Sequence, residues 1–425
     1  MTEMGSPPTN AGDDVGQGVG TPAEPTVPVP RSWTLRFGLV WFGYWMATLA
    51  PVQLVLPAQL EKLDPVHKVR DFGLISGLTG IAALLTLPLF GAWCDRTTSR
   101  FGRRRAWIVG GLALFAAGLV ATGYQGHWLG VGAAWLVATL GANAASVGLT
   151  ATIADSVPDE QRGTISAAIY APQAIGIVVG LAAVSAVGED AFPAAYALLA
   201  VLLLVTGVPF VRAYREVTPS AAAHPRASLL DQLRVGPRPD NDFNWAFACR
   251  VLVNLGNALG TTYLYFFLKD GLKVADPDES LLILTVVYLI FTLFATAVGG
   301  YLSDRLQRRR VFVAAASTLQ AIAALLLAAF PSFSVALVGA ALLGAGYGAF
   351  MSVDQALITQ VLPDAASRAK DLGIMNVGSA GPQALAPLAA SLVISSLGGY
   401  PVLFGTAGVT TIVGALTVYR VRSVR

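Results

Sequence analysis

The sequence predicts an all-α membrane protein in which 12 transmembrane helices form two parallel-repeat six-helix bundles and both termini are cytoplasmic. Three observations predict this fold: an apolar composition, apolar runs of membrane-spanning length, and a repeat that relates the two halves. Of 425 residues, 55% are hydrophobic and only 12% are charged, whereas soluble domains carry about 25% charged residues. Lipid is therefore expected to be the main solvent and partner of the chain.

Twelve apolar runs are long enough to span a membrane, which requires about 20 mostly apolar residues. Their approximate ranges are 35–56, 72–93, 106–124, 129–154, 165–187, 193–213, 244–268, 280–302, 311–330, 332–358, 373–396 and 400–419.

These runs predict a six-helix bundle over 31–213, a cytoplasmic linker over 214–242 and a second six-helix bundle over 243–425. Residues 1–30 are rich in Pro, Gly and Thr and contain no apolar stretch, so we expect a disordered cytoplasmic tail.

The distribution of Lys and Arg predicts the orientation, because short loops that are rich in these residues stay on the cytoplasmic side. With the N-terminus inside, the outer loops contain only five of the 28 Lys and Arg residues, namely Lys62, Lys68, Arg70, Lys269 and Lys273. The remaining basic residues cluster beside spans and do not cover one soluble face, so we do not expect a nucleic-acid partner.

The two halves repeat in the same order and direction. Asp95 matches Asp304 at an offset of 209 residues, Pro158 matches Pro363 at 205, and the Pro-Gln pair at Gln173 recurs at Gln383 at 210. Parallel repeats of this kind are a feature of secondary transporters.

The segment that follows the second span resembles the inner-loop signature G-x-x-x-D-R-x-x-x-R-R of the major facilitator superfamily. It contains Gly91, Asp95, Arg96, Arg100 and the run 103–105. The form D-R-T-x-S-R-F-G-R-R-R is most similar to the glycoside-pentoside-hexuronide and sucrose-type cation symporter branch. The resemblance implies two bundles around a central cavity and transport by alternating access.

One departure from that branch concerns the coupling ion. The melibiose-type symporters carry acids within their second helix, whereas residues 73–93 here contain none. We therefore expect protons, and not sodium, as the coupling ion.

Charged residues at the predicted cytoplasmic ends of the spans are candidates for a gate, because partly desolvated opposite charges attract strongly. The resemblance implies this role for Asp95 and Arg96. The alternative is that the basic residues only retain the loop inside, and we favour it for the run 103–105. The candidate gate comprises Gly91, Asp95, Arg96, Arg100, Asp155, Arg162, Asp304 and Arg305.

Two charged residues lie within predicted spans, where each costs about 3 kcal/mol to insert. Arg250 lies about two turns into the seventh span and Asp354 about one turn before the end of the tenth. We expect them to pair, with Asp354 as the site of proton coupling. The alternative is a fixed structural ion pair.

Gln173 and Gln383 each follow a proline near the middle of a span, where a kinked helix exposes carbonyl groups and where transporters bind substrate. Amides and hydroxyls suit a neutral sugar-like ligand, although Asn and Tyr side chains also link helices. The predicted substrate cavity contains Gln173, Gln383, Asn143, Asn254, Asn257 and Tyr347.

These observations predict a monomeric, multi-pass carrier of the cell membrane, which moves a small polar solute by proton-coupled symport. An exporter of amphipathic compounds and a receptor that binds without transport remain alternatives. The sequence contains neither H-E-x-x-H nor G-x-S-x-G nor a Walker motif, and neither its three His nor its two Cys residues are spaced as metal ligands. We therefore expect no catalytic residues, metal or other cofactor, and two free thiols at Cys94 and Cys249.

Overall fold

The computed structural model describes residues 28–158, 161–188, 191–214, 216, 241–306, 308–361 and 368–421, which form helices joined by short turns. The N-terminal bundle consists of α1 (Arg31–Ala50), α2 (Leu56–Leu63), α3 (Lys68–Arg96), α4 (Arg103–Gly123), α5 (Trp128–Ser156), α6 (Arg162–Ser185) and α7 (Phe192–Ala213). The C-terminal bundle consists of α9 (Asn241–Thr262), α10 (Leu264–Phe266), α11 (Pro277–Leu306), α12 (Arg309–Ala329), α13 (Phe333–Val361), α14 (Arg368–Ser396) and α15 (Gly399–Thr417).

The all-helical class is confirmed. Among the described residues, 10 helices are long and apolar enough to cross a membrane, or 11 if the bent pair of α9 and α10 is one span. All the predicted apolar ranges fall on helices, but within α6 only Pro172–Ser185 forms an apolar stretch. The number of twelve spans and the cytoplasmic termini therefore stay predictions. The predicted tail, apart from residues 28–30, and most of the predicted linker lie outside the described residues.

Two helices are interrupted where a bundle needs a bend. A π-helical turn, Pro51–Val55, joins α1 to α2, because Pro51 has no N–H to donate and the N–H of Leu56 instead reaches back to the Pro51 carbonyl. The chain also bends by 43° between α9 and α10, at Tyr263. Both breaks lie near the same end of the molecule.

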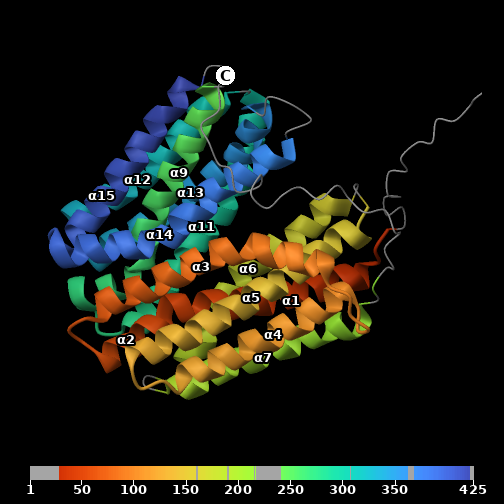
Figure 1. Ribbon diagram of the computed structural model, residues 1–425. Coiled ribbons are helices and arrows are strands. Elements are labelled where there is room, and N and C mark those ends of the chain that lie inside the picture. The colour runs from red at the N-terminus through yellow and green to blue at the C-terminus, as the bar shows by residue number, and fades with distance from the viewer. Residues whose placement is uncertain are drawn as a thin grey trace, which may run out of the picture.

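The two bundles meet mainly along α3 and α14, which are packed closely through small residues (Figure 1). Gly73 lies against Ser391, Gly77 against Leu388 and Gly80 against Ala384, so the two helices run antiparallel. Such small residues allow helix backbones in a membrane to approach closely.

This packing is confined to one end of the molecule. A Cβ atom added at Gly91 of α3, or at Gly381 of α14, would meet no other atom within 4 Å. Figure 1 shows the bundles together near α2 and apart at the opposite ends of α3 and α14. We call the first region, which carries Glu61 and Lys68, the closed end, and the region that carries Asp95 and Arg104 the open end.

The close packing of α3 on α14, which we call the seam, gives a first prediction. Replacing Gly80 with Ala would place the new Cβ 2.8 Å from the Cα of Ala384, so the bundles must separate locally at a cost of about 1–3 kcal/mol. Gly110→Ala is the matched control, because its Cβ would meet nothing within 4 Å. Thermal unfolding in detergent should show a lower melting temperature for G80A than for G110A. Equal melting temperatures would contradict the seam.

Candidate functional site

A cavity of about 350 Å³ lies between the bundles. Leu49, Gln53, Gln173, Ala174 and Ile177 line it from the N-terminal bundle, and seven helices of the C-terminal bundle, α9 to α15, line the rest. Its polar lining residues are Gln53, Gln173, Asn257, Thr261, Thr285, Tyr288, Thr292, Gln320, Tyr347, Gln383 and Thr411. None of the described residues that line it is charged. The cavity therefore offers amides and hydroxyls on an otherwise aliphatic wall.

The structure brings four of the six residues of the predicted substrate cavity to this wall: Gln173, Gln383, Asn257 and Tyr347. Gln173 and Gln383 lie on α6 and α14, the two helices that the repeat equates. One carbonyl near Pro172 is already used, because Trp45 donates its indole N–H to the Ile169 carbonyl at 3.0 Å. The side chains of the two glutamines are thus the groups that the repeat presents to a ligand.

The other two predicted residues, Asn143 and Asn254, do not line the cavity, and their amides have partners within the protein. Asn143 of α5 donates to Thr86 Oγ1 at 2.8 Å and to the Ala83 carbonyl at 3.2 Å, so it links α5 to α3. Asn254 donates to the Arg250 carbonyl at 2.8 Å. The geometry of Asn143 thus fits a hydrogen bond between helices and not a contact with a ligand.

Sequence reasoning missed Gln320, which lies on α12 and lines the cavity. Its side chain is 1% exposed, and neither its amide nitrogen nor its amide oxygen has a hydrogen-bond partner. The signal available in the sequence was a polar residue in the middle of an apolar helix. The first half of the repeat has no glutamine at the equivalent position, so the repeat did not draw attention to Gln320.

Arg250 and Asp354 form the predicted buried ion pair. Arg250 Nη1 lies 2.6 Å from Asp354 Oδ2, and both side chains are 4% exposed. The same guanidinium donates from Nε to Ser379 Oγ at 2.6 Å. Tyr347 donates to Asn254 Oδ1 at 3.5 Å, so a polar chain runs from the ion pair, through the Arg250 carbonyl and Asn254, to a residue that lines the cavity.

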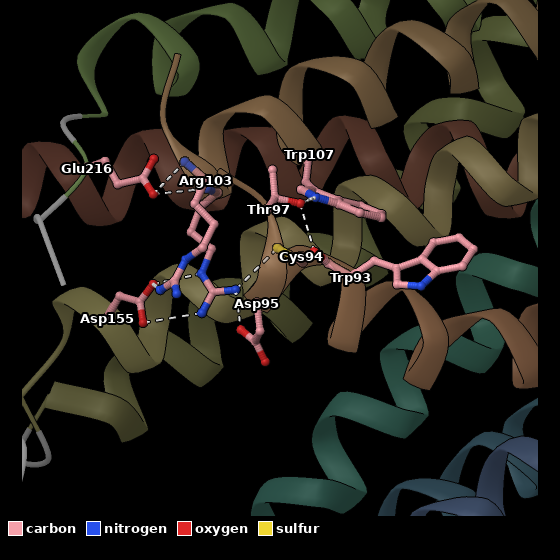
Figure 2. A network of polar contacts seen from close by, with 9 residues as sticks. Trp93, Cys94, Asp95, Thr97, Arg103, Trp107, Asp155 and Glu216 are labelled. Atoms are coloured by element: carbon pink, nitrogen blue, oxygen red, sulfur yellow. Dashed lines mark hydrogen bonds and ion pairs between the residues drawn. The ribbon is translucent and has the colours of Figure 1, made fainter. Parts of the chain in front are cut away.

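At the open end, Arg104 is the centre of a network that holds α3, α4 and α5 together; Figure 2 shows its partners Cys94, Asp95 and Asp155. Its Nε lies 2.7 Å from Asp155 Oδ2, and its Nη1 lies 2.7 Å from Asp95 Oδ1 and 3.2 Å from Cys94 Sγ. Arg104 is 6% exposed. Asp95 and Asp155 are thus brought together as expected, but by a residue that the sequence assigned to loop retention.

The remaining residues of the predicted gate are not joined to this network. Arg96 and Arg305 are exposed and show no ion pair with an acid among the described residues, and Arg100 stacks on Phe101 at 4.9 Å. Gly91 faces open space. The side chains of Arg162 and Asp304 lie outside the described residues.

Glu216 ties the chain beyond α7 to the start of α4. Its Oε1 accepts hydrogen bonds from the backbone N–H groups of Arg103 at 2.7 Å and Arg104 at 3.1 Å (Figure 2), where a carboxylate is favoured by the positive end of the helix dipole. Burial raises the pKa of the nearby Tyr214 phenol, and the charges of Glu216 and Asp155 act in the same direction. The Arg104 cation therefore balances a locally acidic region.

The sequence profile of the Major Facilitator Superfamily matches residues 37–275 and 252–425, which together span both bundles. The chain belongs to the major facilitator superfamily. It is therefore a multi-pass membrane protein with a transporter fold, and its resemblance to one symporter branch stays a prediction.

Two curated relatives of this superfamily member are the proteins named "Proton-associated sugar transporter A" from Mus musculus and Rattus norvegicus. Each is 37% identical over 78 residues, which are 18% of this chain and 10% of the relative. The match thus spans about a tenth of the length of those relatives.

Two solved structures share the fold. One is a POT family transporter in complex with a thioalcohol-conjugated peptide, with a TM-score of 0.72, 13% identity and coverage of 92% of this chain and 96% of that one. The other is a POT family transporter in complex with 5-aminolevulinic acid, with a TM-score of 0.71, 12% identity and coverage of 94% and 97%.

The closed end of this major facilitator protein is held by a charged cluster that sequence reasoning did not predict. Lys68 Nζ lies 2.8 Å from Glu61 Oε1 within its own bundle and 2.7 Å from Asp270 Oδ1 in the other, and Lys269 Nζ lies 2.9 Å from Glu61 Oε2. We call Glu61, Lys68, Lys269 and Asp270 the closed-end ring. The signal in the sequence was that Lys68 and Lys269 are two of only five Lys and Arg residues in the outer loops and that each lies near acids.

Tyr263, at the bend between α9 and α10, adds an uncharged link across the same end. Its hydroxyl lies 3.1 Å from the Val69 carbonyl of the N-terminal bundle and 3.0 Å from the Pro387 carbonyl of its own bundle. The break in the helix thus positions a hydrogen-bond donor at the seam.

The Arg104 network predicts different effects for neighbouring arginines. Arg104→Gln leaves Asp155 without its main cation and should lower the free energy of unfolding by about 3 kcal/mol. Arg105→Gln is the control, since Arg105 has the same chemistry but forms no ion pair among the described contacts. Thermal unfolding of both variants checks this, and an equal loss in R105Q would mean that only the charge of the run matters.

The closed-end ring predicts a change in access to the cavity. Lys68→Glu places three acids together and should open this end, so a cysteine introduced at Thr261 should react faster with a maleimide that cannot cross the membrane, in a background with Cys94 and Cys249 replaced by Ser. Adding Asp270→Lys should restore part of the protection. Unchanged labelling in K68E would show that the ring does not control access.

Proposed function

We propose that this protein moves a small, neutral, sugar-like solute across the cell membrane by alternating access, with protons as the coupling ion. The observation that carries the proposal is the uncharged polar cavity between the bundles, which a hydrogen-bonded chain connects to a buried ion pair. Burying polar and charged side chains within the membrane-spanning region is energetically unfavourable, and such side chains mark substrate and ion pathways.

Alternating access requires one end to open as the other closes. In this structure, contacts between the bundles are found at one end, whereas the described ion pairs of the other end lie within one bundle. The closed-end ring and Tyr263 join the bundles at one end, whereas the Arg104 network lies within one bundle at the open end. With the orientation predicted from the basic residues, this state is open to the cytoplasm. Breaking the cross-bundle ion pairs would open the other side.

Proton coupling is assigned to Asp354. While Asp354 is ionised, it holds Arg250, whose Nε also binds Ser379 of α14. Protonation of Asp354 would remove the charge that holds the guanidinium and free it to move with α14. Because Asn254 links this pair to Tyr347, a ligand in the cavity and a proton on Asp354 can favour the same conformation.

The relatives support the substrate class without deciding it. The curated matches are named as proton-associated sugar transporters, and the uncharged lining of this cavity suits a neutral solute. The solved neighbours bind a peptide and 5-aminolevulinic acid, which carry charges that this lining would leave without counter-charges.

An exporter of amphipathic compounds is the second candidate, because much of the lining is aliphatic, including Leu284, Leu289 and Leu343. Such a ligand would leave the lining amides without partners, which is costly in an apolar environment. Dye export against a proton gradient would select this candidate.

The proposal predicts that Asp354→Asn abolishes proton-driven accumulation but leaves exchange of solute in both directions. The measurement is uptake of labelled sugars into proteoliposomes with and without an imposed proton gradient. Asp276→Asn is the control: Asp276 is exposed and accepts a hydrogen bond from the N–H of Glu279 at the start of α11, a role that Asn can also fill. Gradient-driven accumulation in D354N equal to that in D276N would remove Asp354 from the mechanism.

A further inference from the structure

Among the described residues that line the cavity, Gln320 is buried with neither polar atom of its amide hydrogen-bonded. Both polar atoms of its amide are inaccessible and unpaired, although the residue lies in the middle of α12. An unpaired buried amide is unfavourable, so its presence in a binding cavity points to a group that arrives with the ligand.

The surrounding helix holds this amide in place. The Gln320 side chain packs against Gly346 of α13. A Cβ added at Gly346 would lie 2.6 Å from Gln320 Cγ and 2.7 Å from the Ala316 carbonyl. A larger residue at 346 would therefore displace the side chain. The aliphatic stem is fixed by packing while the amide remains unpaired, an arrangement that orders the group before a ligand binds.

Asn257 of α9 provides a second amide with free hydrogen-bonding capacity. It is 4% exposed and lies beside the Tyr288 hydroxyl, and its Nδ2 makes no hydrogen bond of ordinary geometry. The preceding residue, Gly256, packs so closely on α15 that an added Cβ would clash with Thr411 and lie 2.9 Å from the Ala407 carbonyl. This contact fixes the rotation of α9 and thereby the position of Asn257 in the cavity wall.

Aromatic rings complete the site. Tyr288 and Tyr347 stack with their centroids 6.4 Å apart and both line the cavity. They offer an apolar surface beside the two amides, which is the combination found in small-molecule sites with a few fixed polar groups.

We infer that Gln320 and Asn257 form the specificity-determining subsite of this transporter and that they bind adjacent hydroxyl groups of a neutral polyol or sugar ring. The inference rests on the proposed function and names its substrate class. An amide donates and accepts at once, and a hydroxyl does the same, so neighbouring hydroxyls satisfy both atoms of Gln320 and the free donor of Asn257. A hydrocarbon surface satisfies none of them.

The test compares binding to the purified full-length protein in nanodiscs, with D-glucose, sucrose and mannitol as probes. Gln320→Leu removes the unpaired amide at similar size, so the ligand-free protein should melt at the same temperature or higher, while its affinity for the best probe falls about tenfold or more. Ser317→Ala is the control: Ser317 is buried on the same helix but bonds the Val313 carbonyl and does not line the cavity.

A second measurement takes its main result from the wild-type protein, which does not depend on the folding of a variant. If glucose binds, at least one of its monodeoxy analogues should bind the wild-type protein about tenfold more weakly, since the missing hydroxyl leaves the amide unpaired, and that difference should disappear in Q320L.

The outcomes separate this inference from the proposed function. A Q320L variant that binds the sugar as tightly as wild type would overturn the subsite and leave proton-coupled transport intact. A wild type that binds none of the three polyols, or that prefers a zwitterionic or cationic probe, would overturn the substrate class. A lower melting temperature for ligand-free Q320L would show that Gln320 is structural and also overturn the inference.

Discussion

Every polar group buried among apolar helices needs a partner, and this constraint decides how the described residues of this protein are arranged. Arg250 is held by Asp354 and Ser379, and Arg104 by Asp95 and Asp155. Such pairs do little for net stability, because desolvation offsets their attraction, but breaking one is costly. In the proposed mechanism the pairs act as switches between alternative arrangements, and the unpaired amide of Gln320 is the group that the ligand satisfies.

Some ion pairs join the two bundles and others lie within one bundle. This difference is the basis of the proposed alternating access. The closed-end ring crosses between bundles, so it exists only while that end is shut. The Arg104 network stays within the N-terminal bundle, and its Asp95 side chain is 64% exposed. In the proposed mechanism, this exposed acid contacts the opposite bundle when the open end closes.

Sequence patterns predicted the features that depend on composition and repetition. The apolar runs predicted the helices, and the Pro-Gln repeat placed Gln173 and Gln383 at the cavity. The repeat could not reveal Gln320, which has no counterpart, or the central role of Arg104, which is one of three adjacent arginines that differ only in the face of α4 on which they lie. The closed-end ring joins residues about 200 positions apart, which come together only where α2 and the start of α3 meet the turn that follows α10.

The proposed function requires that sugar and protons cross the membrane in one coupled step. The decisive measurement is the internal pH of proteoliposomes, followed with a trapped dye, when a transported sugar is added outside with no gradient imposed. The account predicts acidification of the interior that begins with sugar entry and is absent in Asp354→Asn. Sugar entry without any change of internal pH would contradict it.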